Sequence, residues 1–210
     1  MSTPRAYHHG DLRAVLLATT ECVLVEGGIG ALSLREISRR AGVSPAAAYK
    51  HFRDKQALLR VYVDAAFEAF AKELQAARDS AASPLDALIA IGVAYVGFAT
   101  ERPASFRVMF RPECTGPPPG NGEPAGRAYA VLVDGMVAAR EAGEIVKGPL
   151  DAQVLAAWCA VHGLATLLLD GPLPELGPGR RIEVLTRSTL EVLIRGLAPK
   201  RRSARAASAG

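Results

Sequence analysis

Polar side chains that can bind phosphate groups and base edges gather in one short part of the chain, residues 33–55. Arginine and lysine donate hydrogen bonds to phosphate oxygens and guanine edges, and serine and tyrosine hydroxyls donate to phosphates. The residues of these types are Ser33, Arg35, Ser44, Tyr49, Lys50, His51 and Lys55. Their chemistry favours the binding of a nucleic acid.

The elements that must position these donors are two short helices joined by a tight turn. Ser33 and Glu36 have the spacing of a capping box, which predicts a helix over 33–41. Ser44 followed by Pro45 is typical of a helix start and predicts a second helix over 45–51. Glycine between them permits the sharp corner of a helix-turn-helix. Such a motif places its second helix in a major groove.

The charge distribution agrees with a polyanionic partner for one part of the chain. Residues 1–60 carry 9 Lys and Arg against 5 Asp and Glu, and residues 198–210 carry 4 against none. Residues 61–197 carry 12 against 16. Basic ends on an acidic middle indicate that the ends meet an anionic polymer while the middle does another job. An ordinary solvated surface is the alternative.

Composition excludes several other classes of protein. A chain of 210 residues that is 50% apolar can bury a core, so it is not disordered as a whole. Its three cysteines, Cys22, Cys114 and Cys159, lie far apart and offer neither a disulfide framework nor a zinc pair. The longest apolar runs, 87–100 and 154–169, hold 14 and 16 residues, below the roughly 18 to 20 that span a bilayer. We expect a cytoplasmic protein without a metal, a cofactor or a membrane.

The hydrophobic periodicity predicts an all-α fold of about nine helices. Clusters of glycine and proline separate helical segments, and no segment alternates like a strand. The predicted helices are 11–26, 33–41, 45–51, 54–80, 84–101, 103–110, 124–142, 150–170 and 180–197. The predicted domains are a DNA-binding domain over 1–56, an effector-binding and dimerisation domain over 57–197, and a disordered basic tail over 198–210.

Several linked motifs in the first 60 residues resemble one known family. They are His9-Gly10-Asp11-Leu12, Ala31-Leu32-Ser33-Leu34-Arg35-Glu36-Ile37, Ala41-Gly42-Val43-Ser44, Tyr49-Lys50-His51-Phe52 and Asp54-Lys55-x-x-Leu58-Leu59. In order and spacing they resemble the DNA-binding domain of the TetR (tetracycline repressor) family. The resemblance implies a homodimeric transcriptional regulator, by family habit a repressor. Its N-terminal domain would bind a palindromic operator in double-stranded DNA, and its helical C-terminal domain would bind a small-molecule effector.

The resemblance also implies roles for single residues in DNA binding. Ser33 would cap its helix near a phosphate, and Arg35 would reach a phosphate or a guanine. The recognition helix would carry Ser44, Pro45, Ala46, Ala47 and Lys50. Tyr49, His51 and Lys55 would grip the DNA backbone.

Two of these roles have structural alternatives, since Tyr49 could instead pack its ring and Ser33 could be only a cap. Alanine offers a base only a methyl group, so base reading should fall on Arg35, Ser44 and Lys50, helped by DNA shape. Residues 5–9, before the first helix, are either a DNA-binding arm or a frayed terminus.

One motif in the second half resembles a subgroup of the same family. Trp158-Cys159-Ala160-Val161-His162-Gly163 is similar to the Trp-His-Gly (WHG) signature of one type of C-terminal domain. Trp158 and His162 lie one helical turn apart on one face. The candidate pocket residues are Tyr95, Phe98, Phe106, Met109, Phe110, Trp158 and His162. They indicate a hydrophobic or aromatic effector, although at helical spacing such residues also form plain cores. For His162 the alternative is a core histidine bound to a carbonyl.

The segment 150–170 is apolar on two faces, which predicts contact with a second subunit. Packing one face inward and one against another copy, together with the last helix, would make an intersubunit four-helix bundle. The predicted interface residues are Val154, Val161, Leu164, Leu168, Leu185, Leu190 and Leu193. A monomer with a central helix is the alternative.

Other functions receive less support from the sequence. The chain has no G-x-x-x-x-G-K-[ST], G-x-S-x-G or H-E-x-x-H motif, so we expect no enzyme. Cys114 in the proline-rich segment 111–123 could make the protein a redox sensor, although a bystander thiol is the simpler interpretation. A nonspecific DNA-binding protein is the third alternative.

Overall fold

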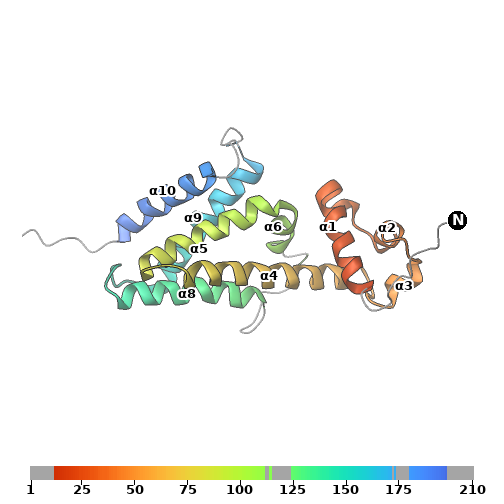
Figure 1. The fold of residues 1–210 in the computed structure, drawn as a ribbon, viewed down its shortest axis with the longest axis horizontal. Coiled ribbons are helices and arrows are strands. Elements are labelled where there is room, and N and C mark those ends of the chain that lie inside the picture. Colours follow the sequence, from red (N-terminus) through yellow and green to blue (C-terminus); the bar gives the residue numbers. More distant parts are fainter. Residues whose placement is uncertain (1–11, 112–113, 115–123, 172, 174–179, 198–210) are drawn as a thin grey trace, which may run out of the picture. The chain divides into compact units, whose positions relative to one another are not determined.

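The computed structural model describes residues 12–111, 114, 124–171, 173 and 180–197, and in these residues the chain is helical without strands (Figure 1). The all-α prediction is confirmed, and the nine helices described begin and end close to the predicted bounds. They are α1 (Leu12–Ala31), α2 (Leu34–Arg40), α3 (Pro45–Tyr49), α4 (Lys55–Asp79), α5 (Pro84–Glu101), α6 (Pro103–Met109), α8 (Pro124–Glu141), α9 (Leu150–Asp170) and α10 (Arg180–Leu197). The predicted tail 198–210 and arm 5–9 lie outside the described residues.

The end of α1 differs most from its prediction. The glycine cluster after residue 26 was expected to end this helix, but helical turns continue to Ala31. At Gly28 the backbone leaves the helical region, with φ 63° and ψ −167°. Glycine adopts this positive φ without the steric cost that a side chain would bring. The helix is therefore broken at Gly28 rather than ended there.

The chain divides into two compact units. The first lies within residues 1–70 and 101–127, and the second within 71–100 and 128–210. In sequence, α4 contributes its residues up to Phe70 to the first unit. The first unit thus holds α6 besides the helix-turn-helix, and the domain boundary expected near residue 56 stays a prediction.

Apolar side chains of the helix-turn-helix pack into the core of the first unit. Ile37 of α2 and Ala48 of α3 are fully buried, as is Leu16 of α1. Phe52, just after α3, is 3% exposed. Helix α2 contacts α1 and α3, and α1 also contacts α6. The predicted anchors of the motif, Ala48 and Phe52, therefore lie in the core.

The second unit has a core of its own, built mainly from α5, α8 and α9. One cluster of buried residues comprises Leu88, Met136, Ala139, Ile145, Val154 and Ala157. Helix α5 approaches α9 and α10 closely at Gly92, where a Cβ would clash with the Leu190 side chain and lie 3.1 Å from Val161 Cγ1. Only glycine allows this approach without displacement of its neighbours.

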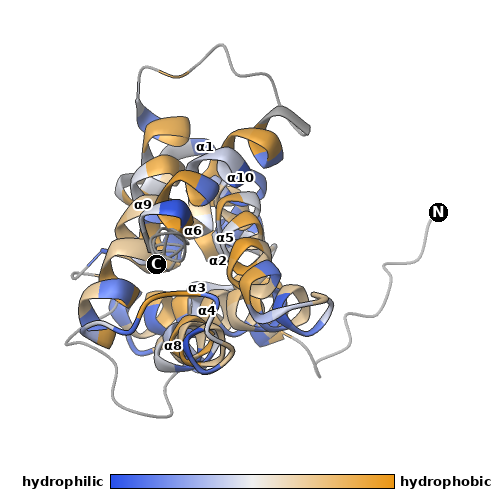
Figure 2. Cartoon of the chain, turned by 90° about the vertical axis from the view of Figure 1, so that its left-hand side faces the viewer, coloured by the Kyte–Doolittle hydropathy of each residue, from blue (hydrophilic) through white to orange (hydrophobic). Residues whose placement is uncertain are grey.

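Three helices are long and apolar enough to cross a membrane, judged by length and composition alone. They are α1, α5 and α9. The runs counted in the sequence were shorter because they were ended by single polar residues, so run length does not by itself exclude a membrane span. Figure 2 shows hydrophobic and hydrophilic residues alternating around many of the helices. Only half or less of each apolar window is buried inside the structure, from 22% in α1 to 50% in α5.

Candidate functional site

Helix α2 begins with the predicted cap. The Ser33 backbone is extended, and its Oγ accepts a hydrogen bond of 3.1 Å from the backbone N–H of Glu36. This bond satisfies one of the N–H groups that have no partner inside the helix. The Glu36 carboxylate binds arginines instead of completing a capping box.

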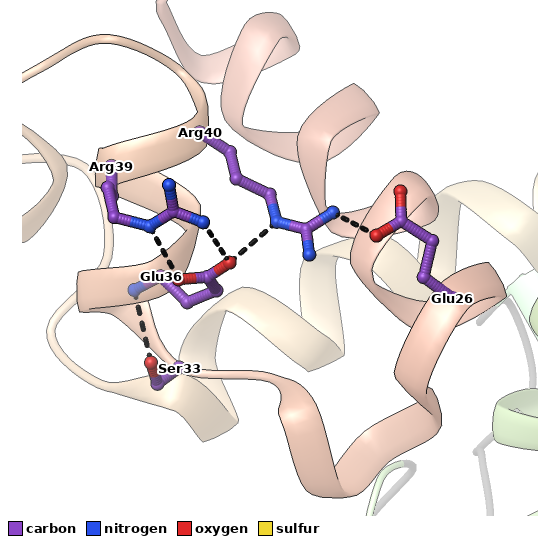
Figure 3. A network of polar contacts seen from close by, with 5 residues as sticks. All are labelled: Glu26, Ser33, Glu36, Arg39 and Arg40. Carbon is purple, nitrogen blue, oxygen red and sulfur yellow. Dashed lines mark hydrogen bonds and ion pairs between the residues drawn. The ribbon is translucent and has the colours of Figure 1, made fainter.

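Four charged side chains form a network on the surface of the first unit (Figure 3). Glu36 binds Arg39 through two hydrogen bonds of 2.9 and 2.7 Å, and its Oε1 accepts 2.6 Å from Arg40 Nε. Arg40 Nη1 also donates to Glu26 Oε2 of α1 at 2.6 Å. The hydrogen bonds from Arg39, followed by those from Arg40, lower the pKa of Glu36 to about 2. The network ties α2 to α1 and engages two of the three arginines of α2.

The recognition helix α3 has a smooth surface. Ser44 Oγ accepts 3.2 Å from the Ala47 backbone N–H, and Pro45 occupies the first turn. Ala46 is exposed and Ala47 is half-buried. Tyr49 ends the helix with 51% of its surface exposed, which disfavours the alternative that its ring is packed away.

Exposed donors surround this helix. The side chains of Arg35, Lys50 and His51 are exposed. None of the three makes a hydrogen bond or ion pair with the residues that the structure describes. The arrangement leaves two permanent cations and an imidazole available to an anionic ligand on one motif.

Lys55 lies differently from the other predicted contacts. Its Nζ is part-buried and donates a hydrogen bond of 2.7 Å to the backbone carbonyl of Ile29, near the end of α1. Asp54 caps the same helix, α4, by accepting 2.8 Å from the Ala57 backbone N–H. The backbone bond is the main cause that lowers the pKa of Asp54. The sequence gave no sign of the bond to Ile29, because its partner lies 26 residues away.

In the second unit, a chain of hydrogen bonds joins α5 to α9. Trp158 Nε1 donates 3.2 Å to the Tyr95 hydroxyl, which lies 2.8 Å from His162 Nδ1. If the indole N–H donates to the phenol, the phenol donates to a neutral imidazole protonated on Nε2. Burial lowers the pKa of His162 and raises that of Tyr95. The predicted pair of Trp158 and His162 is thus completed by Tyr95, and the Tyr129 ring lies 5.8 Å from the indole.

The other predicted pocket residues lie in two cores. Phe98 is buried in the second unit. Phe106, Met109 and Phe110 belong to the first unit, where Phe110 packs 5.0 Å from Phe106 and 5.6 Å from Phe67 between ring centroids. Within each unit, these side chains have the packing of a core.

A second polar cluster, which the sequence did not predict, joins three helices of the first unit. The Tyr62 hydroxyl of α4 binds Glu21 of α1 and lies 2.6 Å from Ser105 Oγ of α6. Ser105 also donates 3.0 Å to Glu21. Because the three residues are 41 to 84 positions apart, no local spacing could have revealed them.

The structure places most of the predicted dimer residues inside the subunit. Val154, Val161, Leu164 and Leu190 are buried in the single chain, and Leu168, Leu185 and Leu193 are half-buried. Periodicity could not choose between the two apolar faces of α9, and the face chosen is the inner one. The large apolar side chains exposed on α9 and α10 are Leu155 (55%), Leu167 (46%), Val184 (58%) and Val192 (69%).

The cysteines are also placed differently from the expectation. Cys114 is 2% exposed, whereas its proline-rich surroundings suggested an accessible thiol. Cys22 and Cys159 are exposed. In the part of the chain that the structure describes, no three or more His, Cys, Asp or Glu side chains are grouped so as to hold a metal ion.

Comparisons with known proteins agree with the geometry of both units. Residues 16–62 match the family of "bacterial regulatory proteins, tetR family", and residues 88–193 match the "Tetracyclin repressor-like, C-terminal domain". The Trp-His-Gly subgroup is not confirmed by these matches and stays a prediction.

Among solved structures, the chain is similar to a protein of unknown function from Rhodococcus sp. RHA1. The two share 33% identity over 94% of this chain and 100% of that one, with a TM-score of 0.78. The fold is also shared with the Bacillus subtilis regulator FadR in complex with stearoyl-CoA (14% identity, 88% and 98% covered, TM-score 0.69). A third similar structure is the ketosteroid regulator KstR2 of Mycobacterium tuberculosis (17% identity, 93% and 99% covered, TM-score 0.61).

Proposed function

This chain belongs to the TetR family of bacterial regulatory proteins, and on that premise we propose that it is a homodimeric repressor that binds a palindromic operator. Members of the family are ligand-responsive DNA-binding regulators of transcription, and the matched structures with a named function are regulators rather than enzymes. A small hydrophobic molecule releases the operator. The protein works in the cytoplasm, where it meets DNA.

One observation carries the proposal: the cations of the helix-turn-helix are divided into paired and unpaired groups. Arg39 and Arg40 are engaged by Glu36, whereas Arg35 and Lys50 make no side-chain hydrogen bond or ion pair among the described residues. Lys50 directly follows the recognition helix, and Arg35 lies in the first turn of α2. An exposed cation at each of these places is what phosphate and base contacts require.

Base reading falls on Arg35, Ser44 and Lys50. The Ser44 oxygen accepts from Ala47, so its O–H remains able to donate to DNA. Ala46 and Ala47 offer methyl groups, which suit thymine, and leave the rest of the discrimination to DNA shape. Ser33 and Tyr49 position the head on phosphates.

The effector binds in the second unit next to Tyr95, Trp158 and His162. A neutral imidazole and a buried phenol suit an uncharged polar group on a mostly apolar molecule better than an isolated charge. Stearoyl-CoA in the FadR structure and the ketosteroid in the name of KstR2 support a hydrophobic ligand. A thermal-shift screen in which only ionic compounds stabilise the protein would contradict this effector class.

The second copy packs on the exposed apolar face of α9 and α10. Leu155 and Leu167 of α9, with Val184 and Val192 of α10, would be covered in an intersubunit four-helix bundle. An effector releases DNA only if it binds better to the arrangement in which the two heads miss successive major grooves. We propose α4, which has residues in both units, as the element that transmits this preference.

The experiment that tests the proposal is fluorescence anisotropy with two DNA duplexes. The first is a duplex selected from a random library by the protein, and the second is a scrambled duplex of the same composition. We expect discrimination above about 10³ at physiological salt. Arg35→Ala and Lys50→Ala should each weaken specific binding by roughly 5- to 150-fold, while Arg39→Ala, the matched control in α2, should change it far less.

The same experiment separates the alternatives. Equal binding of both duplexes, with a steep salt dependence, would favour a nonspecific DNA-binding protein. Peroxide-dependent release abolished by Cys114→Ser would favour the redox sensor, although the burial of Cys114 disfavours it. A monomeric mass in dilute solution would contradict the dimer.

A further inference from the structure

We propose that Lys55 is a positioning residue that holds the recognition helix in register between α1 and α4, rather than a phosphate contact. The inference rests on the proposed function and concerns how its DNA-binding head is built. Its starting point is the hydrogen bond of 2.7 Å from Lys55 Nζ to the carbonyl oxygen of Ile29. The lysine side chain is part-buried at this bond, unlike the exposed Lys50.

The backbone of α1 is shaped to offer that carbonyl. At Gly28 the helix breaks with a φ of 63°, so Ile29 begins a short final turn. Within this turn the Ile29 oxygen accepts only a long bond of 3.4 Å from the Leu32 backbone N–H. A carbonyl oxygen has two lone pairs, and the ammonium group of Lys55 meets the requirement for a stronger donor.

Electrostatics favours the same placement. Lys55 is the first residue of α4, where the positive end of the helix dipole disfavours a cation. The end of α1 is a negative end and favours one. The side chain therefore gains by leaving its own helix and binding the end of α1.

The position of Lys55 in the chain makes this bond relevant to DNA reading. Helix α3 ends at Tyr49, and α4 begins six residues later with Asp54 as its cap. At its other end, α3 is held by the turn after α2, where the Val43 N–H donates 3.0 Å to the Ser38 carbonyl. Lys55 completes the second attachment, so loss of its bond should let α3 shift without unfolding the head.

The test is Lys55→Met, which keeps the length and apolar stem of the side chain and removes its charge and donors. Binding to the selected duplex and to the scrambled duplex is measured by anisotropy at several salt concentrations, and the folded fraction by circular dichroism. Lys50→Met is the matched control, because Lys50 is an exposed lysine proposed to touch DNA directly.

We expect Lys55→Met to weaken binding to the selected duplex by about 10-fold at every salt concentration, with the scrambled duplex bound as before. The dependence of log K on log salt should keep its slope. Lys50→Met should reduce that slope by about 0.9 per site. A fully folded Lys55→Met variant with lost discrimination and an unchanged slope supports positioning.

Three results would overturn the inference. A reduced slope, with both duplexes bound more weakly, would make Lys55 a phosphate contact. Unchanged binding by the folded variant would make the bond to Ile29 only a packing detail. A loss explained wholly by the unfolded fraction would make it only a structural bond. Failure of the wild-type protein to discriminate between the duplexes would instead count against the proposed function.

Discussion

Each unit of the molecule contains a polar cluster, and the two clusters differ in charge and in exposure. In the first unit, Glu26, Glu36, Arg39 and Arg40 form ion pairs at the surface. In the second, Tyr95, Trp158 and His162 form a largely neutral chain of hydrogen bonds around a buried phenol. The ion pairs are screened by salt, whereas the buried chain is protected from it.

The difference indicates two kinds of ligand. A surface that keeps its own carboxylates bound to two arginines, and leaves Arg35 and Lys50 exposed, is suited to a polyanion that must be both attracted and released. A desolvated site with neutral donors and acceptors is suited to a molecule that is itself mostly apolar. Salt, mutation and pH should therefore affect the two clusters separately.

The largest expected effect is that of salt. Raising the monovalent salt from 50 to 200 mM should weaken operator binding by on the order of 10³ or more, if six or more phosphates are contacted. Trp158 is the only tryptophan in the chain, so its emission reports the second cluster alone. The emission should stay constant over the same salt range. A parallel change in the emission would contradict the separation of the two clusters.

A smaller effect is expected from Tyr95→Phe. The substitution removes the hydroxyl that joins Trp158 to His162 and leaves their ring nitrogens without this partner. Unpaired buried polar groups cost about 1 to 3 kcal/mol each, so the unfolding midpoint in urea should fall. Tyr129→Phe is the control, because Tyr129 also packs on Trp158 but is largely exposed. Operator binding by the folded Tyr95→Phe protein, and its salt dependence, should not change.

The smallest effect is expected from Glu36→Gln, and it should depend on pH. The arginines lower the pKa of Glu36 to about 2 in the folded protein, below the ordinary value of 4.5. The resulting stability is present above pH 4.5 and is lost as the pH falls towards 2. The melting temperature of Glu36→Gln should thus be slightly below that of the wild type at pH 6, and the two should converge in acid. A difference that persists at pH 2 would mean that the glutamine disturbs packing instead.

Local sequence signals predicted the elements of the head, because these signals act over three or four residues. Ser33 and Ser44 cap their helices as their spacing indicated, and Ala48 and Phe52 are buried as anchors. The same reasoning failed where a contact joins distant segments. The bond of Lys55 to Ile29 arises from the break at Gly28, which no helical periodicity encodes.

The inner face of α9 could not be predicted for a different reason. Both of its faces are apolar, so the hydrophobic pattern contains no information about which one meets the core. Val154 and Val161 face inward, while Leu155 and Leu167 remain exposed. Only packing against α5, whose Gly92 approaches Val161 and Leu190, decides between them.

The pair of alanines on the recognition helix has an evolutionary consequence. Ala46 and Ala47 commit the helix to no particular hydrogen bond, and alanine is the residue that favours a helix most. A single mutation to a longer polar side chain would add a base contact without breaking an existing one. The repressor could therefore acquire a new operator by gaining an interaction, a route closed to a helix that is already filled with specific contacts.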